Sequence, residues 1–183
     1  MLKFILQYIK KPRTTGAILP SSKYLAQKMV ANIDFAEAKC IVEYGPGTGV
    51  FTEKLLSRRH KDTKVILIER NEEFYFMLKD KFSDQSNLQI VNDSAENIGK
   101  YLAENNIDHA DYIISGLPFA SLPSSLSENI LEQTKKYLKP GGKFITFQYT
   151  LFKANVFARF FTKPQINWEV RNVPPAYVLT FQK

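Results

Sequence analysis

Short apolar runs alternate with segments of helical periodicity along most of the chain, and this alternation restricts the possible folds more than any other feature of the sequence. We expect strands at Cys40–Tyr44, Lys64–Glu69, Leu88–Val91, Tyr112–Ser115 and Phe144–Tyr149. Between them, the spacing of apolar residues predicts helices at Val50–Arg59, Glu72–Phe82, Ala95–Asn105 and Ser124–Leu138. Strands joined by crossover helices lie parallel in one sheet. The sequence therefore predicts an α/β domain with a largely parallel central sheet.

The last third of the chain departs from this alternation. Leu151–Phe161 is apolar and aromatic, and we expect a helix whose phenylalanines, like Trp168, lie in the core. Ile166–Val173 and Tyr177–Phe181 are strand-like, and the three residues between them are too few for a parallel crossover. These two strands are therefore expected to pair antiparallel.

The length and the cysteine content limit the architecture further. The 183 residues fit one domain, taken as residues 1–183, and a hydrophobic content of 44% is sufficient for a core. Cys40 is the single cysteine, which excludes an internal disulfide framework and a cysteine-rich zinc site. Because it opens an apolar run, we expect a buried thiol in a reducing cytoplasm. No metal site is expected.

The charge of the chain favours anionic partners. The net charge is +7 and the sequence pI is about 9.4. Nucleic acid, anionic lipid and phosphorylated substrates all fit this balance, which does not choose among them. No apolar stretch reaches the roughly 18–20 residues of a membrane span. The N-terminus has no clean apolar h-region and no small-residue cleavage site, so a secretory signal is not expected.

The segment Glu43-Tyr44-Gly45-Pro46-Gly47-Thr48-Gly49 joins the first expected strand to its helix. Glycines permit a sharp turn and a close approach of a ligand to the backbone. In a doubly wound sheet this loop lies at the carboxyl edge of the strands, where ligands bind. A second acid, Glu69, ends the next strand, about 20 residues past the loop, which is the placement of an acid that binds ribose hydroxyls.

Two kinds of ligand fit such a loop. A dinucleotide site requires G-x-G-x-x-G, but here the third glycine comes one residue early. Glu43 also sits two residues before the first glycine, where a carboxylate suits a cationic ligand better than a pyrophosphate. S-adenosylmethionine carries a sulfonium and an ammonium group and no phosphate. A strand–helix turn without a ligand is the third alternative, and the two acids beside the loop argue against it.

The loop and its acids resemble the first motifs of the class I S-adenosylmethionine-dependent methyltransferases. Asp93, just after the third strand, is similar to the residue that meets the adenine in that family. The resemblance covers nearly the whole chain and implies a Rossmann-like, mostly parallel seven-stranded sheet with an antiparallel C-terminal strand pair. It implies S-adenosylmethionine as cofactor, bound by Glu43, Gly45, Pro46, Gly47, Thr48, Gly49, Glu69, Arg70, Asp93, Ser94 and Ser115.

Three further segments are similar to the soluble bacterial phosphatidylethanolamine N-methyltransferases: 16–22, 115–119 and 171–176, read as GAILPSS, SGLPF and RNVPPA. The glycine loop and the Leu-Pro-Phe element also resemble ribosomal RNA adenine dimethyltransferases. Those enzymes carry an Asn or Asp where this chain has Ser115, and usually a C-terminal helical domain beyond the last strand. The resemblance places the methyl acceptor and the catalytic residues at Ser115, Leu117, Pro118 and Phe119.

The resemblance implies methyl transfer to the amine of an aminophospholipid headgroup such as phosphatidylethanolamine. The alternatives are N6-methylation of an RNA adenine, methylation of a small amine, and a module that binds S-adenosylmethionine without catalysis.

The N-terminus adds a membrane hypothesis. Leu2, Ile5, Leu6 and Ile9 follow helical spacing, and Lys3, Lys10, Lys11 and Arg13 surround that face. A basic amphipathic helix can lie in the interface of an anionic bilayer, so residues 1–13 are expected to bind the inner face of the membrane. The alternative is that this helix packs on the domain's own core. Residues 1–35 as a whole are expected to form a helical extension over the cofactor site.

Overall fold

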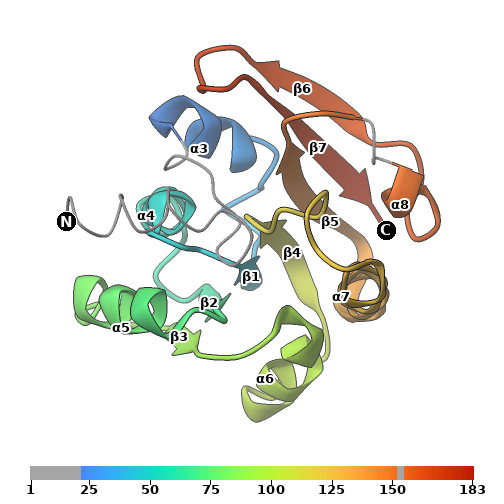
Figure 1. The fold of residues 1–183 in the computed structure, drawn as a ribbon. Coiled ribbons are helices and arrows are strands. Elements are labelled where there is room, and N and C mark those ends of the chain that lie inside the picture. Colours follow the sequence, from blue (N-terminus) through green and yellow to red (C-terminus); the bar gives the residue numbers. More distant parts are fainter. Residues whose placement is uncertain (1–21, 152–154) are drawn as a thin grey trace.

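The computed structural model describes residues 22–151 and 155–183, and its centre is a seven-stranded sheet of order β3-β2-β1-β4-β5-β7-β6 (Figure 1). Five strands are parallel: β1 (Cys40–Tyr44), β2 (Lys64–Ile68), β3 (Leu88–Val91), β4 (Ala110–Ser115) and β5 (Leu138–Gln148). β7 (Ala176–Gln182) runs antiparallel between β5 and β6 (Gln165–Glu169). The predicted mostly parallel sheet with an antiparallel C-terminal pair is confirmed.

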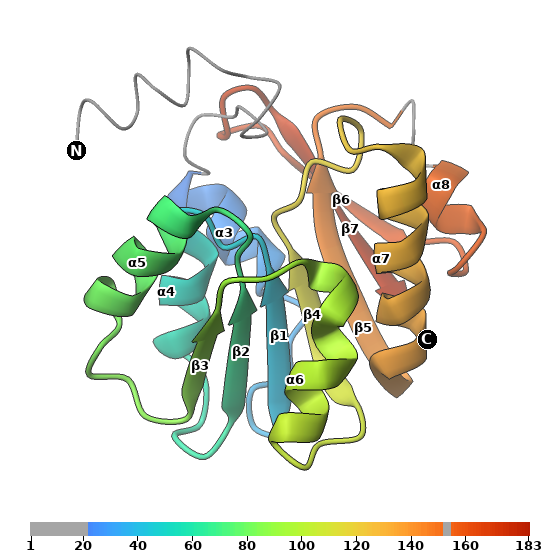
Figure 2. The same cartoon turned by 60° about the horizontal axis from the view of Figure 1, so that its bottom comes forward.

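Helices cover both faces of this sheet (Figure 2). On one face lie α3 (Lys23–Met29) and α4 (Val50–Leu56), and α5 (Glu72–Lys81) packs along β3. On the other lie α6 (Ile98–Glu104), which follows the 3-10 turn Ala95–Asn97, together with α7 (Ser124–Tyr137) and α8 (Asn155–Ala158). Each face is sealed by one apolar cluster, so the sheet is buried on both sides as a parallel sheet requires.

The carboxyl ends of the parallel strands converge on one edge of the sheet. Tyr44 ends β1 and pairs with Ile68 of β2 and with Ser115 of β4. The loops that follow these three strands carry the glycine motif, Glu69 and the Leu-Pro-Phe element. The topology thus brings the main predicted site segments to one edge.

Some expectations fail in the last third. β6 ends at Glu169 rather than Val173, because the chain turns at Val170 and Arg171, where the Glu169 carboxylate accepts from the Arg171 N–H. The prediction that Trp168 lies in the core is wrong: it is 56% exposed. Trp168 stands on the edge strand, beyond the cover of α8, and its ring stacks on Tyr177 of β7.

Other expectations are confirmed or fall outside the described part. Cys40 is buried, as predicted, and this burial raises its pKa to about 12. Residues 1–21, including the expected amphipathic helix, lie outside the described residues. Within residues 22–151 and 155–183, no helix combines the length and apolarity of a membrane span, and no group of three or more His, Cys, Asp or Glu could hold a metal ion.

Candidate active site

The glycine loop between β1 and α4 has a backbone that other residues rarely adopt. Gly45 and Gly47 have φ of +60° and +56°, in the left-handed region. A Cβ on Gly45 would lie 2.7 Å from Cδ2 of Leu117, whereas a Cβ on Gly47 would meet nothing within 4 Å. The loop is therefore packed against Leu117 at Gly45 and open at Gly47, where a ligand can approach the backbone.

Glu43 lies under this loop and is fully buried. Its Oε2 accepts a hydrogen bond of 2.7 Å from Thr52 Oγ1 in α4, while Oε1 is buried without a partner. Burial raises the pKa of Glu43 to about 8; the bond from Thr52 counteracts this, and the charge of Glu69 adds to it. Ionised Glu43 would be stabilised by a cation or a donor at Oε1, which is what the amino-acid part of S-adenosylmethionine supplies.

Glu69 connects the loop to the end of β2. Its Oε2 accepts from the Gly47 N–H at 3.0 Å, and its Oε1 accepts from the Asn71 N–H at 2.8 Å. Burial raises the pKa of Glu69, and these backbone donors counteract the rise. Each carboxylate oxygen can accept more than one hydrogen bond. The carboxylate is thus held in place and keeps acceptor capacity for hydroxyl groups.

Asp93 and Ser94 lie at the end of β3. Asp93 accepts hydrogen bonds from Tyr101 (2.6 Å), Asn97 (2.8 Å) and the Ser94 N–H (2.7 Å). Its burial acts to raise its pKa, but these donors outweigh burial and the pKa is lowered. The Ser94 hydroxyl donates to Glu96. Asp93 is therefore an ionised, oriented acceptor.

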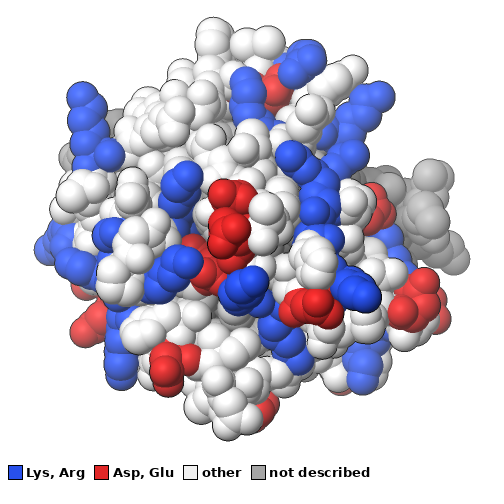
Figure 3. All heavy atoms as spheres, turned by 180° about the vertical axis from the view of Figure 1, so that it is seen from behind, with Lys and Arg blue, Asp and Glu red and all other residues white. Residues whose placement is uncertain are grey.

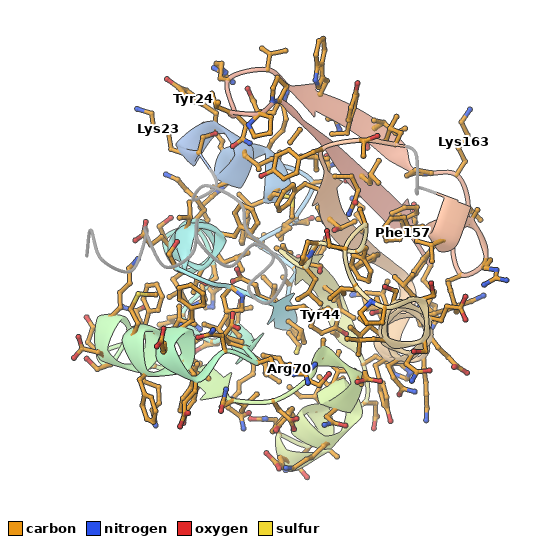
Figure 4. All side chains as sticks on the ribbon, viewed as in Figure 1. Lys23, Tyr24, Tyr44, Arg70, Phe157 and Lys163 are labelled. Atoms are coloured by element: carbon orange, nitrogen blue, oxygen red, sulfur yellow. The ribbon has the colours of Figure 1, made fainter. Side chains whose placement is uncertain are left out.

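Arg70 follows Glu69 and is exposed. It lies on the side of α5 and α6, well apart from Phe157 at the other end of the sheet (Figure 4). Its carbonyl accepts a hydrogen bond from Asn92 after β3. The structure thus places Arg70 next to Glu69 with an exposed side chain.

The acceptor segment Ser115–Phe119 touches the glycine loop directly. The Gly116 N–H donates to the Tyr44 carbonyl at 2.8 Å, and a Cβ on Gly116 would lie 2.6 Å from the Gly45 carbonyl oxygen. Ser115 is buried, and its Oγ accepts from the Leu117 N–H at 3.2 Å. The predicted cofactor and acceptor segments are therefore in contact, and the close approach leaves no room for a side chain at position 116.

Phe119 lies deeper than expected. It is 4% exposed, and its ring centroid is 5.2 Å from that of Phe157 and 6.3 Å from that of Phe144. Phe157 stands between α8 and the sheet, on the α7 side (Figure 4). The Phe119 ring thus belongs to an aromatic cluster of the core in this structure, and its role as a wall for the acceptor stays a prediction.

The sequence analysis missed four residues that donate hydrogen bonds to these acids: Asn71, Thr52, Tyr101 and Asn97. Asn71 is the N-cap of α5, and its position before Glu72-Glu73 was a recognisable capping signal. Thr52 lies nine residues after Glu43, and Tyr101 lies eight residues after Asp93. No local sequence pattern predicts either hydrogen bond. Gln148, at the end of β5, was also missed: it is 6% exposed and its Nε2 has no partner.

Comparisons with known proteins identify relatives of this chain. The profile of the ribosomal RNA adenine dimethylase family matches residues 10–161. An ornithine lipid N-methyltransferase of Singulisphaera acidiphila is 32% identical over 175 residues, which cover 94% of this chain and 91% of that protein. A ribosomal RNA small subunit methyltransferase A of Hydrogenobaculum is 27% identical over 72% of this chain, which spans 48% of that longer enzyme.

Solved structures share the fold. The N-methyltransferase NodS of Bradyrhizobium japonicum, in complex with S-adenosyl-L-homocysteine, superposes with a TM-score of 0.70 over 88% of this chain and 85% of that one, at 11% identity. TrmN of Thermus thermophilus has the same TM-score, at 14% identity, over 87% of this chain and 48% of that one.

Proposed function

The chain belongs to the ribosomal RNA adenine dimethylase family and is an S-adenosylmethionine-dependent methyltransferase, and on this premise we propose that it methylates the amine of a lipid headgroup. The observation that carries the proposal is the 32% identity to an ornithine lipid N-methyltransferase along 94% of this chain. An aminophospholipid such as phosphatidylethanolamine is the proposed acceptor, and an ornithine lipid is the acceptor to test beside it.

We call the glycine loop with Glu43, Glu69 and Asp93 the cofactor half of the site. Its residues fit S-adenosylmethionine, which when bound supplies an electrophilic methyl group. Glu43 offers a buried carboxylate oxygen without a partner, beneath the loop. Gly47 leaves its backbone open, and Glu69 keeps capacity to accept from hydroxyl groups. Asp93 and Ser94, with Arg70 at the rim, would border the adenine. Catalysis would consist mainly in positioning donor and acceptor.

The acceptor segment would hold the attacking nitrogen. Ser115 offers a buried hydroxyl at the end of β4, and the carbonyls of Gly116 and Leu117 follow it. Such groups accept hydrogen bonds from an amine, which orients its lone pair toward the cofactor side of the loop. The nitrogen must lose its proton before it attacks, because an ammonium ion has no lone pair. Pro118 restricts the backbone between these carbonyls and Phe119.

RNA is the second candidate, and the family match and the Hydrogenobaculum relative favour it. One observation makes it the second candidate: Ser115 offers an exocyclic amine a poorer partner than Asn or Asp would.

The deciding experiment incubates the protein and labelled S-adenosylmethionine with total lipid and total RNA in parallel. We expect label in the lipid fraction, and none with the Gly47→Val variant. Label confined to RNA would replace the lipid proposal with the adenine alternative. Transfer of label only in a third incubation, with a mixture of small amines, would favour a soluble amine. Cofactor binding without any transfer would favour the non-catalytic module.

We further propose that residues 1–183 form a single domain whose segment 1–35 covers the cofactor site, with residues 1–13 on the inner face of an anionic membrane. The support is the basic amphipathic pattern of that segment. Replacing Lys3, Lys10, Lys11 and Arg13 by glutamine should weaken binding to anionic vesicles. Each basic side chain near such a surface contributes roughly 1 kcal/mol to the binding free energy. Unchanged vesicle binding would contradict this proposal.

A further inference from the structure

Exposed apolar side chains gather at one end of the sheet. Among the described residues, six large apolar side chains are exposed, and only Phe76 on α5 lies elsewhere. The other five are on β6, on the loop from β6 to β7, or just after β5: Leu151 (38%), Ile166 (46%), Trp168 (56%), Val170 (56%) and Val173 (73%). A gathering of this kind on a surface marks an interaction site more often than isolated apolar residues do.

This end of the sheet shares its edge with the acceptor segment. Ser115 pairs with Thr146 of β5, and two residues further Gln148 pairs with Tyr177 of β7. Tyr177 in turn pairs with Trp168 of β6. Trp168 therefore stands three strand spacings from β4, about 14 Å at the usual separation of strands, at the same carboxyl edge.

The loop that exposes these residues is held by buried polar groups. Asn172 is 2% exposed; it accepts from the Ser22 N–H at 2.9 Å and donates to the Pro174 carbonyl at 2.8 Å. Glu169 is 1% exposed and accepts from the Arg171 backbone and side chain at 2.9 and 3.0 Å. These hydrogen bonds hold the loop in one conformation, and Val173 at its tip is exposed. The apolar tip is therefore a defined part of the surface.

Basic side chains border this surface. The Arg171 guanidinium lies 4.2 Å from the centre of the Tyr24 ring, and Lys23 Nζ lies 5.3 Å from the same ring. Lys28 and Arg171 share the single carboxylate of Glu169, which leaves an excess of positive charge. Figure 4 shows Lys23 and Lys163 on opposite sides of the sheet's β6–β7 end, and Figure 3 shows a largely uncharged area over the β6 edge.

We propose that the β6 rim, defined as Ile166, Trp168, Val170, Val173 and Arg171, inserts into the interface of an anionic bilayer and so delivers headgroups to the Ser115–Phe119 segment. The inference rests on the proposed lipid function and concerns a surface separate from residues 1–13. A tryptophan and aliphatic side chains bordered by bases match the apolar and anionic layers of such an interface. Two copies of the rim would instead bring their basic borders together, which opposes self-association.

The test uses the single tryptophan of the chain as a reporter. The full-length protein is mixed with vesicles of anionic lipid in two parallel samples. The lipid carries bromine on its acyl chains in one sample and not in the other. Trp168 fluorescence should shift to shorter wavelength and be quenched by the brominated lipid. Val173→Glu should weaken vesicle binding on the order of tenfold. Phe76→Glu is the matched control, a similarly exposed apolar residue on the far side of the sheet, and should leave binding unchanged.

The following results would overturn the inference. Binding to vesicles with Trp168 unquenched, or equal losses in the two glutamate variants, would place the contact elsewhere. A dimer in solution that Val173→Glu dissociates would assign the rim to a second copy. If Val173→Glu unfolds, Val173→Ser serves in its place. Headgroup methylation in detergent without vesicle binding refutes the rim and keeps the lipid function, whereas RNA labelling alone refutes both.

Discussion

The two halves of the carboxyl edge have opposite chemistry. At the carboxyl ends of β1, β2 and β3 lie three carboxylates, Glu43, Glu69 and Asp93, each oriented by hydrogen bonds from the domain itself. At the carboxyl ends of β4 and β5, and at the neighbouring start of β7, lie a small hydroxyl, backbone carbonyls and aromatic rings, followed by the exposed Trp168 of β6. The polar half is arranged for one charged, hydroxyl-rich ligand. The second half offers few polar groups, so the choice of acceptor depends on shape and apolar contact.

The largest effect that would test this division is expected at Gly47. Gly47→Val should abolish S-adenosylmethionine binding in calorimetry, because the side chain would fill the open space beside the loop and strain a left-handed backbone. Gly141→Val is the matched control: φ there is +76°, nothing lies within 4 Å, and it stands near the opposite end of β5. Equal loss of binding in both variants would indicate a general folding defect.

A smaller loss is expected when a carboxylate of the cofactor half is removed. Glu69→Ala should weaken cofactor binding by about 1.5–3 kcal/mol, roughly 10- to 150-fold, since a charged hydrogen-bond partner is lost. Glu169→Ala removes a buried carboxylate from the other half and should change cofactor affinity by no more than about twofold. Similar losses in the two variants would contradict the division of the edge.

In the acceptor half, Phe119 can be tested as a wall or as part of the core. Phe119→Leu should lower turnover roughly tenfold with cofactor affinity unchanged, because the acceptor would be less well positioned. Phe161→Leu, in the same aromatic cluster, should cost a similar stability of about 1–2 kcal/mol and leave turnover intact. Equal turnover in the two variants would assign Phe119 to the core alone.

What could be predicted from the sequence follows the same division. The glycine loop, Glu69 and the strands before them have local signals: apolar runs, glycines and an acid at fixed spacing. No local signal predicts the exposure of Trp168 or the burial of Phe119, because both depend on how far the four-residue α8 covers the sheet and on rings distant in sequence. Thr52 was not predicted for the same reason, since its hydrogen bond to Glu43 exists only once α4 packs on β1. The sequence therefore predicts the residues with local signals, and it does not predict burial that depends on packing between distant segments.

The smallest expected effect concerns protonation of Glu43. Its pKa is raised from the model-compound value of 4.5 to about 8, so the folded state holds a proton that the unfolded state releases between these values. Stability that Glu43 contributes below pH 4.5 should therefore be lost as the pH rises toward 8, and Glu43→Gln should remove this pH dependence in chemical denaturation.

Because a bound cation favours the ionised carboxylate, cofactor binding near pH 7 should release up to one proton, which calorimetry in buffers of different ionisation enthalpy measures. Thr52→Val should raise the pKa of Glu43 further and move both effects to higher pH, since the hydrogen bond that favours the ionised form is lost. Binding without proton release, together with a pH profile that Glu43→Gln leaves unchanged, would mean that the charge of this buried acid does not contribute to holding the cofactor.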